Sequence, residues 1–210
     1  MTEQTPLTKE GCAACLPNVD TDIMDRFEIY LTLLTKWQRA INLVGKNTLA
    51  DAWRRHILDS AQLLPCIEKT ARIADLGSGA GLPGLLIAIA TGANVQLVES
   101  DQRKATFMRE VARETATKIE VHAARIEDLP PLHADIVTAR ALAPLPKLLP
   151  WVHRHLKIGG KSLLMKGADV DQELTESAKQ WTMNVVRKPS LSDASGTILI
   201  VNDLSPLTDG

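Results

Sequence analysis

Apolar side chains recur with helical spacing in the first part of the chain. They lie at steps of three and four residues, at Ile23, Phe27, Tyr30, Leu34, Trp37 and Ile41. This spacing predicts one apolar stripe along a helix of about five turns that ends near residues 42–45. A second helix is predicted from Thr48 to Pro65, because Thr48-Leu49-Ala50-Asp51 has the composition of a capped helix start. Residues 1–20 have no periodicity and predict a flexible, loosely docked tail, so residues 21–66 are expected to form an N-terminal helical cap.

Beyond residue 70, short β-like runs alternate with helical runs, which is typical of a parallel sheet with helices on both faces. Parallel strands are expected at residues 72–76, 95–99, 119–122, 135–139 and 162–166. After a predicted helix at 172–181, two further runs, 184–188 and 197–201, are joined by so short a loop that they favour an antiparallel hairpin. The sequence therefore predicts an α/β, Rossmann-like sheet of seven strands, five parallel strands and then the hairpin, in a single domain over residues 21–210.

The most informative stretch is Asp75-Leu76-Gly77-Ser78-Gly79-Ala80-Gly81, which joins the first predicted strand to a second apolar run. Its glycines permit a sharp turn and a close approach to a ligand, and the free N–H groups of the next helix face that ligand. Leu82 stands where a dinucleotide fingerprint has its third glycine, and the lysine of a phosphate-binding loop is missing. The loop predicts a nucleotide-like cofactor, and a purely structural turn is the alternative.

Two acidic residues indicate which cofactor this is. Asp75 lies just before the first glycine of the loop, and Glu99 closes the next strand. Carboxylates at these places suit a ligand with hydroxyl groups and an ammonium group. S-adenosylmethionine has both and carries no phosphate, so we expect it to bind at the carboxyl ends of the strands.

Composition limits the remaining possibilities. The chain has 210 residues, a formal net charge of -1, 45% apolar residues and only 3% aromatic residues. One sizeable core fits this length, and so few aromatic residues argue against an extended stacking surface for single-stranded RNA. The longest apolar run, residues 85–90, is too short to span a bilayer, so a cytoplasmic location is expected. Cys12 and Cys15 form a lone C-x-x-C pair, and no metal site is expected from it.

Basic residues on the predicted helices have two interpretations. A helix that begins after Asp101 carries several of them on its outer face. The ordinary interpretation is that these residues form a solvated surface, and the more specific one is that they contact RNA phosphates. The expected phosphate contacts are Arg54, Arg55, Arg103, Lys104 and Arg109. His56 lies one helical turn from Ser60, where a packed structural histidine is the alternative to a functional one.

Several short motifs occur in order across most of the chain. They are Trp37 with Ile41-Asn42-Leu43, then His56-Ile57-Leu58-Asp59-Ser60, the loop from Asp75 to Gly84, Arg125-Ile126-Glu127, Arg140-Ala141 and Lys166-Gly167. In these motifs the chain resembles the glucose-inhibited division protein B family, the ribosomal small-subunit methyltransferases G. It departs from the family pattern at Leu86, where relatives often have proline, and in its cysteine-bearing tail.

The resemblance implies a class I methyltransferase fold and the transfer of a methyl group from S-adenosylmethionine to N7 of one guanosine in 16S ribosomal RNA of the small subunit. It implies cofactor contacts at Gly77, Leu82, Ile126, Glu127 and Arg140, to which the loop pattern adds Asp75, Gly79, Gly81 and Glu99. The other matched motifs suggest substrate contacts at Asn42, His56 and Lys166. A monomer without a membrane partner is expected.

The chemistry of guanine N7 agrees with the residues at hand. This nitrogen has a free lone pair and no proton to lose, so no general base is required, and the chain shows no evident Ser-His-Asp or Cys-His set. No catalytic residue is therefore assigned, and Arg140 is expected to position the cofactor or the guanine. Two alternatives stay open: a methyltransferase for a small molecule or a protein, and a cofactor-binding ribosome assembly factor without turnover.

Overall fold

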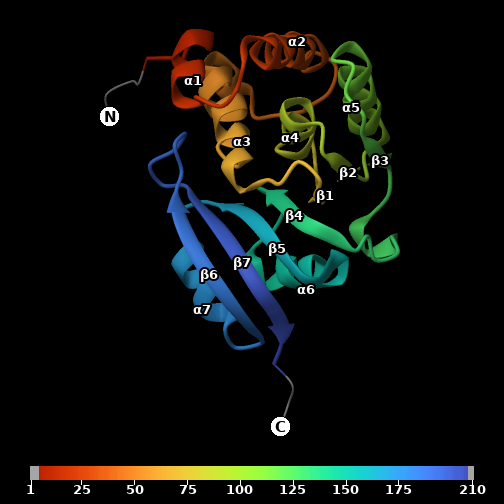
Figure 1. Ribbon diagram of the computed structural model, residues 1–210, viewed down its shortest axis with the longest axis vertical. Helices are drawn as coiled ribbons and strands as arrows, with labels where there is room; N and C mark the ends of the chain where they lie inside the picture. The colour runs from red at the N-terminus through yellow and green to blue at the C-terminus, as the bar shows by residue number, and fades with distance from the viewer. Residues whose placement is uncertain (1–4, 208–210) are drawn as a thin grey trace.

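A seven-stranded sheet forms the centre of the computed structural model, which describes residues 5–207 (Figure 1). The strands are β1 (Arg72–Leu76), β2 (Asn94–Val98), β3 (Glu120–His122), β4 (Ala134–Arg140), β5 (Leu156–Lys166), β6 (Trp181–Pro189) and β7 (Thr197–Pro206). Their order across the sheet is β3-β2-β1-β4-β5-β7-β6. Strands β1 to β5 pair in parallel, and β7 pairs antiparallel with both β5 and β6. The predicted arrangement of five parallel strands and a hairpin is confirmed.

Each face of the sheet buries its own apolar cluster. Ile73 of β1 belongs to one cluster and its neighbour Ala74 to the other, and Leu163 and Leu164 of β5 divide in the same way. This division follows from the alternation of side chains along a strand.

Helices cover both faces (Figure 1). The first face is covered by α2 (Thr21–Trp37), α4 (Gly84–Thr91) and α5 (Gln102–Glu114). The second face is covered by α6 (Leu145–His155) and α7 (Val170–Ser177). As predicted, α5 begins after Asp101, whose side chain accepts a hydrogen bond from the Arg103 N–H.

Strands β5 and β6 begin earlier than predicted. β5 starts at Leu156 instead of residue 162, because Leu156 pairs with Ala134 across an irregular register. β6 starts at Trp181, where the sequence predicted a helix, because Trp181 pairs with Pro206 of β7. The paired residues are distant in the sequence, so local periodicity does not indicate that they pair.

Residues 5–20 are not a loose tail, and the prediction for this segment is wrong. They include the helix α1 (Lys9–Cys15), in which Cys12 is fully buried. Lys9 Nζ lies 2.6 Å from a carboxylate oxygen of Asp25 and 2.7 Å from one of Glu28, both on α2. So short a helix depends on tertiary packing, which its own sequence does not reveal. The remainder of the predicted tail, residues 1–4, lies outside the described residues.

The helix α2 ends at Trp37, several residues before its predicted end. The side-chain amide of Gln38 explains this difference. Its oxygen accepts hydrogen bonds from the N–H groups of Leu43 and Val44, and its nitrogen donates to the Val44 carbonyl at 2.8 Å. Gln38 therefore holds the following residues as a loop, which reaches the carboxyl edge of the sheet.

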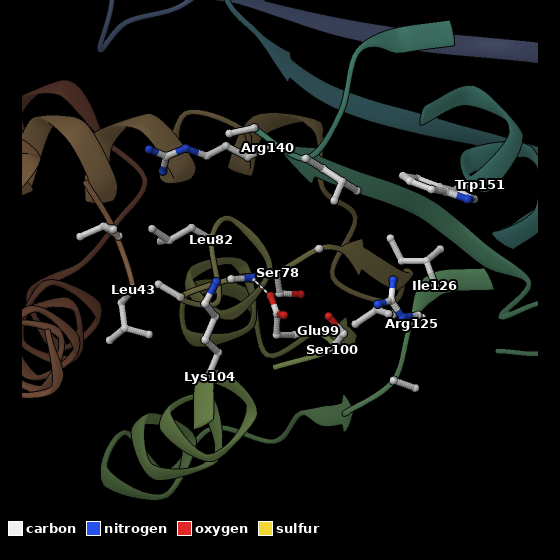
Figure 2. A pocket seen from close by; sticks show the side chains of 18 of the residues that line it. Leu43, Ser78, Leu82, Glu99, Ser100, Lys104, Arg125, Ile126, Arg140 and Trp151 are labelled. Atoms are coloured by element: carbon white, nitrogen blue, oxygen red, sulfur yellow. Dashed lines mark hydrogen bonds between the residues drawn. The ribbon is translucent and has the colours of Figure 1, made fainter. Parts of the chain in front are cut away.

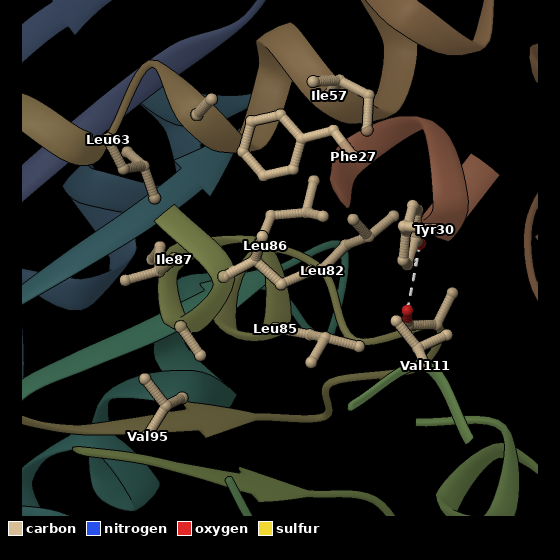
Figure 3. Packing of buried hydrophobic residues seen from close by; sticks show 14 of the residues in the cluster. Phe27, Tyr30, Ile57, Leu63, Leu82, Leu85, Leu86, Ile87, Val95 and Val111 are labelled. Carbon is tan, nitrogen blue, oxygen red and sulfur yellow. Dashed lines mark hydrogen bonds between the residues drawn. The ribbon is translucent and has the colours of Figure 1, made fainter. Parts of the chain in front are cut away.

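The second predicted helix of the cap is present as a series of short helical pieces. They are η1 (Lys46–Asp51), η2 (Trp53–Leu58), α3 (Asp59–Ala61) and η3 (Leu64–Cys66). Phe27 and Tyr30 of α2 pack with Ile57 of η2 against α4 (Figure 3). The Tyr30 hydroxyl donates to the Ala80 carbonyl of the glycine loop at 3.0 Å. The cap therefore shares a core with the sheet and supports the loop directly.

Candidate functional site

A cavity of about 570 Å³ opens at the carboxyl ends of β1, β2 and β4 (Figure 2). Its wall is made by the glycine loop, by residues that follow β2, β3 and β4, and by parts of the cap, α5 and α6. Cavities of roughly 300–1,000 Å³ hold nucleoside-sized ligands in other proteins. Its place at this edge of the sheet is the one that the parallel strands predict.

The structure divides the predicted site residues into two groups. Those that line the cavity are Gly77, Gly79, Leu82, Glu99, Ile126, Glu127, Arg140, His56 and Lys104. Those outside its lining are Asp75, Gly81, Asn42, Lys166, Arg54, Arg55, Arg103 and Arg109.

The loop glycines have different roles, although all three adopt positive φ. Gly77 has φ +65°, and a Cβ there would lie 2.4 Å from Leu142. Gly79 has φ +56°, and within residues 5–207 the nearest atom to a Cβ there is the Gly77 carbonyl oxygen, at 3.9 Å. At Gly81 a Cβ would lie 2.8 Å from the Cβ of Leu85 in α4. Gly81 is therefore required for packing against α4, its cofactor contact stays a prediction, and Gly79 is the glycine with open space before it.

Asp75 lies beneath the loop and does not line the cavity, so its predicted contact with the cofactor stays a prediction. Its side chain is fully buried on the α4 side of β1. The Thr138 hydroxyl donates to its carboxylate at 2.6 Å, and the Gly84 N–H donates at 3.2 Å. Burial raises the pKa of Asp75 to about 6, against the opposing effect of these hydrogen bonds.

This raised pKa predicts a pH effect on stability. Folded Asp75 binds its proton more tightly than the unfolded chain does, so its stabilising contribution is present below pH 4 and is lost as the pH rises through about 6. Chemical denaturation of wild type between pH 4 and 7 should show a loss of roughly 3 kcal/mol that is absent from Asp75→Asn.

Asp193→Asn is the control for this measurement. Arg55 lowers the pKa of Asp193 to about 2, so its contribution changes only below pH 4. Equal slopes for wild type and Asp75→Asn between pH 4 and 7 would contradict the effect.

Glu99 connects the loop to α5 and faces the cavity (Figure 2). Its carboxylate accepts the Gly79 N–H at 2.9 Å and the Asp101 N–H at 2.8 Å. A carboxylate has about four acceptor sites. Two backbone donors leave capacity for the hydroxyl groups of a bound ribose.

Glu99→Ala is expected to weaken the binding of S-adenosylmethionine by roughly 1–3 kcal/mol, because it removes an acceptor for charged hydrogen bonds and loosens Gly79. Calorimetric titration measures this loss. Glu120→Ala is the matched control, since Glu120 is an exposed carboxylate of β3 outside the lining. Equal affinity of Glu99→Ala and Glu120→Ala for S-adenosylmethionine would show that Glu99 does not contribute to cofactor binding.

Arg140, the last residue of β4, is held by the cap. Its Nε lies 3.0 Å from Asp59 Oδ2, and its Nη2 donates to the Arg55 carbonyl at 2.9 Å. Among the described residues, its buried Nη1 has no hydrogen-bond acceptor. Ala141, the next residue, lines the cavity with φ +49°, a strained value for a residue other than glycine.

His56 lines the cavity as a neutral side chain. Burial, with the nearby charges of Arg140 and Arg55, lowers its pKa to about 3. Its Nε2 lies 2.9 Å from the Thr48 hydroxyl. The cap loop that contributes Leu43, Val44, Gly45 and Thr48 to the wall is thereby fixed at both ends, by Gln38 and by His56.

Lys166 and Asn42 lie away from the wall. Lys166 Nζ lies 2.7 Å from Glu173 and donates to the Ala143 carbonyl at 3.0 Å, next to a smaller neighbouring cavity that Arg140 also lines. The structure therefore gives Lys166 a role in holding the chain after β4.

Most of the expected phosphate contacts are engaged within the protein. Arg54 pairs with Asp51, Arg55 with Asp193, and Arg103 with Asp101. Arg109 donates to the Val121 carbonyl at 3.1 Å. Lys104 differs, because it lines the cavity and has no hydrogen-bond acceptor within residues 5–207.

Several residues of the wall were not predicted. They are Leu43, Val44, Gly45, Thr48, Ser78, Ala80, Val98, Ser100, Ala124, Ala141, Leu142, Lys147 and Trp151. Ser100 and Ala124 could have been found, since each closely follows a predicted strand at the ligand-binding edge. Lys147 and Trp151 lie one turn apart on α6, and no local signal in the sequence shows that this helix reaches the cavity.

Residues 5–207 contain neither a membrane-spanning helix nor a cluster of metal-ligating side chains. Within residues 5–207 no helix has the length and apolar character needed to cross a bilayer. Over the same residues, no three His, Cys, Asp or Glu side chains come together as a possible metal site.

The sequence of the chain is similar to a known family over most of its length. The model of that family, described as rRNA small subunit methyltransferase G, matches residues 23–198. The ribosomal RNA small subunit methyltransferase G of Paramagnetospirillum magneticum is 50% identical over 200 residues, which cover 95% of this chain and 94% of that one. The protein of the same name from Rhodospirillum rubrum is 50% identical over 199 residues, covering 94% and 98% of the two chains.

Solved structures show the same fold at low sequence identity. The PH0226 protein of Pyrococcus horikoshii superimposes with a TM-score of 0.63 at 13% identity, covering 80% of this chain and 98% of that one. TYW2 of M. jannaschii, solved in complex with AdoMet, has a TM-score of 0.58 at 12% identity and covers 72% of this chain and 76% of its own.

Proposed function

The chain belongs to the rRNA small subunit methyltransferase G family, and we propose that it methylates N7 of one guanosine in 16S ribosomal RNA with S-adenosylmethionine as methyl donor. Membership carries this proposal, since half of the residues are identical to those of relatives with this name over nearly the entire chain. The cavity at the carboxyl edge of the sheet is the proposed reaction site.

The cavity fits S-adenosylmethionine in size and polarity. Its volume of about 570 Å³ suits one nucleoside-sized ligand, and the space before Gly79 is open to it. Glu99 supplies acceptors for ribose hydroxyls, and Ile126 with Glu127 lines the wall after β3. We therefore assign cofactor contacts to Gly77, Gly79, Leu82, Glu99, Ile126, Glu127 and Arg140.

The proposed reaction requires that the methyl donor and the guanine be positioned correctly, and it requires no proton transfer. The sulfonium of S-adenosylmethionine supplies an electrophilic methyl group, and guanine N7 attacks with its lone pair without losing a proton. His56, whose pKa is lowered to about 3, is neutral at physiological pH, which suits a wall that faces a purine gaining positive charge. The target base has to leave its stack to reach the cavity.

We further propose that the chain acts as a single domain in which the cap closes over the catalytic sheet. The cap supplies Leu43, Thr48 and His56 to the wall, and α1 packs on it, so the domain extends to residues before 21. We propose that it acts as a monomer in the cytoplasm, where the small ribosomal subunit is found.

The test is methylation of small ribosomal subunits, or of naked 16S RNA, isolated from cells that lack this gene. With S-adenosylmethionine labelled on the methyl group, the product nucleosides are separated and identified by mass spectrometry. The expected result is one 7-methylguanosine per RNA. Label in another nucleoside or in a protein would contradict the proposed substrate. Tight cofactor binding without transfer to either substrate would favour an assembly factor.

A further inference from the structure

The half-buried side chain of Trp151 on α6 is shared by two hollows of the surface. It lines the cofactor cavity, and it also lines a second hollow of about 1010 Å³ beside it. Figure 2 shows Trp151 at the edge of the cofactor cavity, close to Ile126 and Arg125. An aromatic ring at such a junction offers a flat apolar surface to whatever passes from one hollow to the other.

Two exposed cations line the cofactor cavity along with this ring. Lys147 Nζ lies 5.5 Å from the centre of the Trp151 ring, and Arg125 follows β3 on the same side of the cavity. Within residues 5–207 neither side chain donates to a carboxylate or a carbonyl, whereas Arg54, Arg55 and Arg103 are all paired. Unpaired cations beside an aromatic ring are the combination that binds single-stranded nucleic acid, phosphate on the cation and base on the ring.

The second hollow lies on the other side of Trp151 and carries charges of both signs. It is lined by His133, His153, Arg154 and Lys157, and by the acidic residues Glu127 and Asp203. Lys157 pairs with Asp135, and Arg154 Nη2 donates to the Leu129 carbonyl. A strand of RNA leaving the cofactor cavity past Trp151 therefore meets a wide hollow in which two cations, Arg154 and Lys157, are balanced by two carboxylates.

We propose that Trp151, Lys147 and Arg125 form a binding subsite for a nucleotide that flanks the target guanosine; this inference rests on the proposed RNA substrate. The flanking base stacks on the Trp151 ring, and Lys147 moves from the ring to the adjacent phosphate. The cation–ring contact of an exposed lysine is weak, so a stacking base displaces it at small cost. One aromatic platform suffices for this subsite, in agreement with the low aromatic content of the chain.

The inference is tested with Trp151→Leu, Trp151→Phe and the control Trp53→Leu. Leucine keeps an apolar side chain against the cluster on the α6 and α7 face of the sheet but removes the ring, whereas phenylalanine keeps a ring. Trp53 is a half-buried tryptophan of the cap that lies outside both hollows. Binding of a labelled single-stranded oligoribonucleotide with a central guanosine is measured by fluorescence anisotropy at saturating S-adenosylmethionine. Cofactor affinity is measured separately by calorimetry.

Trp151→Leu is expected to lower the affinity for the oligonucleotide by roughly 5- to 100-fold, and Trp151→Phe is expected to keep most of the affinity. Cofactor affinity should stay within about twofold of wild type, and Trp53→Leu should bind both ligands as wild type does. A loss of cofactor affinity with unchanged RNA binding would overturn the inference and make Trp151 a platform for the adenine of the cofactor. Unchanged binding of both ligands would leave Trp151 a packing residue.

Charge variants test the same subsite without changing the core. The double variant Lys147→Gln with Arg125→Gln should bind the oligonucleotide more weakly. Its binding should also depend less on salt concentration, because two phosphate contacts are lost. Lys69→Gln with Lys118→Gln removes the same charge before β1 and β3, at the opposite edge of the sheet, and should have little effect. Equal salt slopes in the two double variants would contradict the subsite. If wild type binds the oligonucleotide but methylates neither subunits nor RNA, the proposed function fails while the subsite stands.

Discussion

Gly79→Val is expected to abolish measurable binding of S-adenosylmethionine while leaving the protein folded. A Cβ at Gly79 meets no atom of residues 5–207 closer than the Gly77 carbonyl oxygen, at 3.9 Å, so the folded chain has room for the side chain. That room lies in the cofactor cavity, which Gly79 lines. The valine side chain and the cofactor therefore compete for the same space. Calorimetric titration and a melting curve of the variant check both parts of this prediction.

Gly92→Val is the control for backbone strain. Gly92 ends α4 with φ +68°, close to the +56° of Gly79, and a Cβ there meets no atom of the described chain within 4 Å. Both substitutions force a left-handed conformation on a branched residue, at a cost of at least about 1–2 kcal/mol. Only Gly79 faces the cavity, so Gly92→Val should lose stability and keep its cofactor affinity. Retained affinity in Gly79→Val would show that the loop is only a structural turn.

Gly77→Val is a poorer test of the same idea. A Cβ at Gly77 would lie 2.4 Å from Leu142, so the substitution disturbs the chain after β4 as well as the cavity. The sequence indicates that both glycines are needed for the turn. It does not indicate which one has a protein neighbour and which one has open space.

The local part of the fold could be predicted from the sequence, and its long-range part could not. Strand β1 was placed at residues 72–76 as observed, because a buried strand and the following glycine turn are both local signals. The end of α2 was missed because it depends on the Gln38 amide bonding to Leu43 and Val44. The start of β6 was missed because it depends on Pro206, which is far along the chain.

The same limit applies to the site. The glycine pattern located the loop, yet Asp75 and Gly81 support it from beneath, since a fingerprint records what the backbone needs and not what the ligand touches. His56 of the cap was predicted, but Val44, Gly45 and Thr48 were missed because they reach the sheet only through tertiary packing. The pairing of Arg140 with Asp59 joins two motifs that were both recognised, but a sequence does not show that two motifs meet.

Arg140→Ala is expected to weaken cofactor binding by roughly 10- to 100-fold, which is the value of one or two hydrogen bonds to a charged group. The guanidinium is held by Asp59 and by the Arg55 carbonyl, so its fixed plane stands at the wall of the cavity. Arg140→Lys should not restore binding, because one ammonium group cannot reproduce both contacts of the fork. Calorimetry gives the affinity, and single-turnover methylation at saturating cofactor gives the rate of chemistry.

Asp59→Asn is the companion variant, because Asp59 acts on the cofactor only through Arg140. Asparagine keeps the shape but weakens the hold on the guanidinium, so cofactor affinity should fall in the same direction and by less. If Asp59 only positions Arg140, then Asp59→Asn combined with Arg140→Ala should bind cofactor as Arg140→Ala does. An Arg bonded to guanine N7 would block the atom that attacks, which excludes N7 as the partner of Arg140 during transfer. Full cofactor affinity in Arg140→Ala with a large loss of single-turnover rate would instead move Arg140 to guanine O6, and additive losses in the double variant would give Asp59 a separate role.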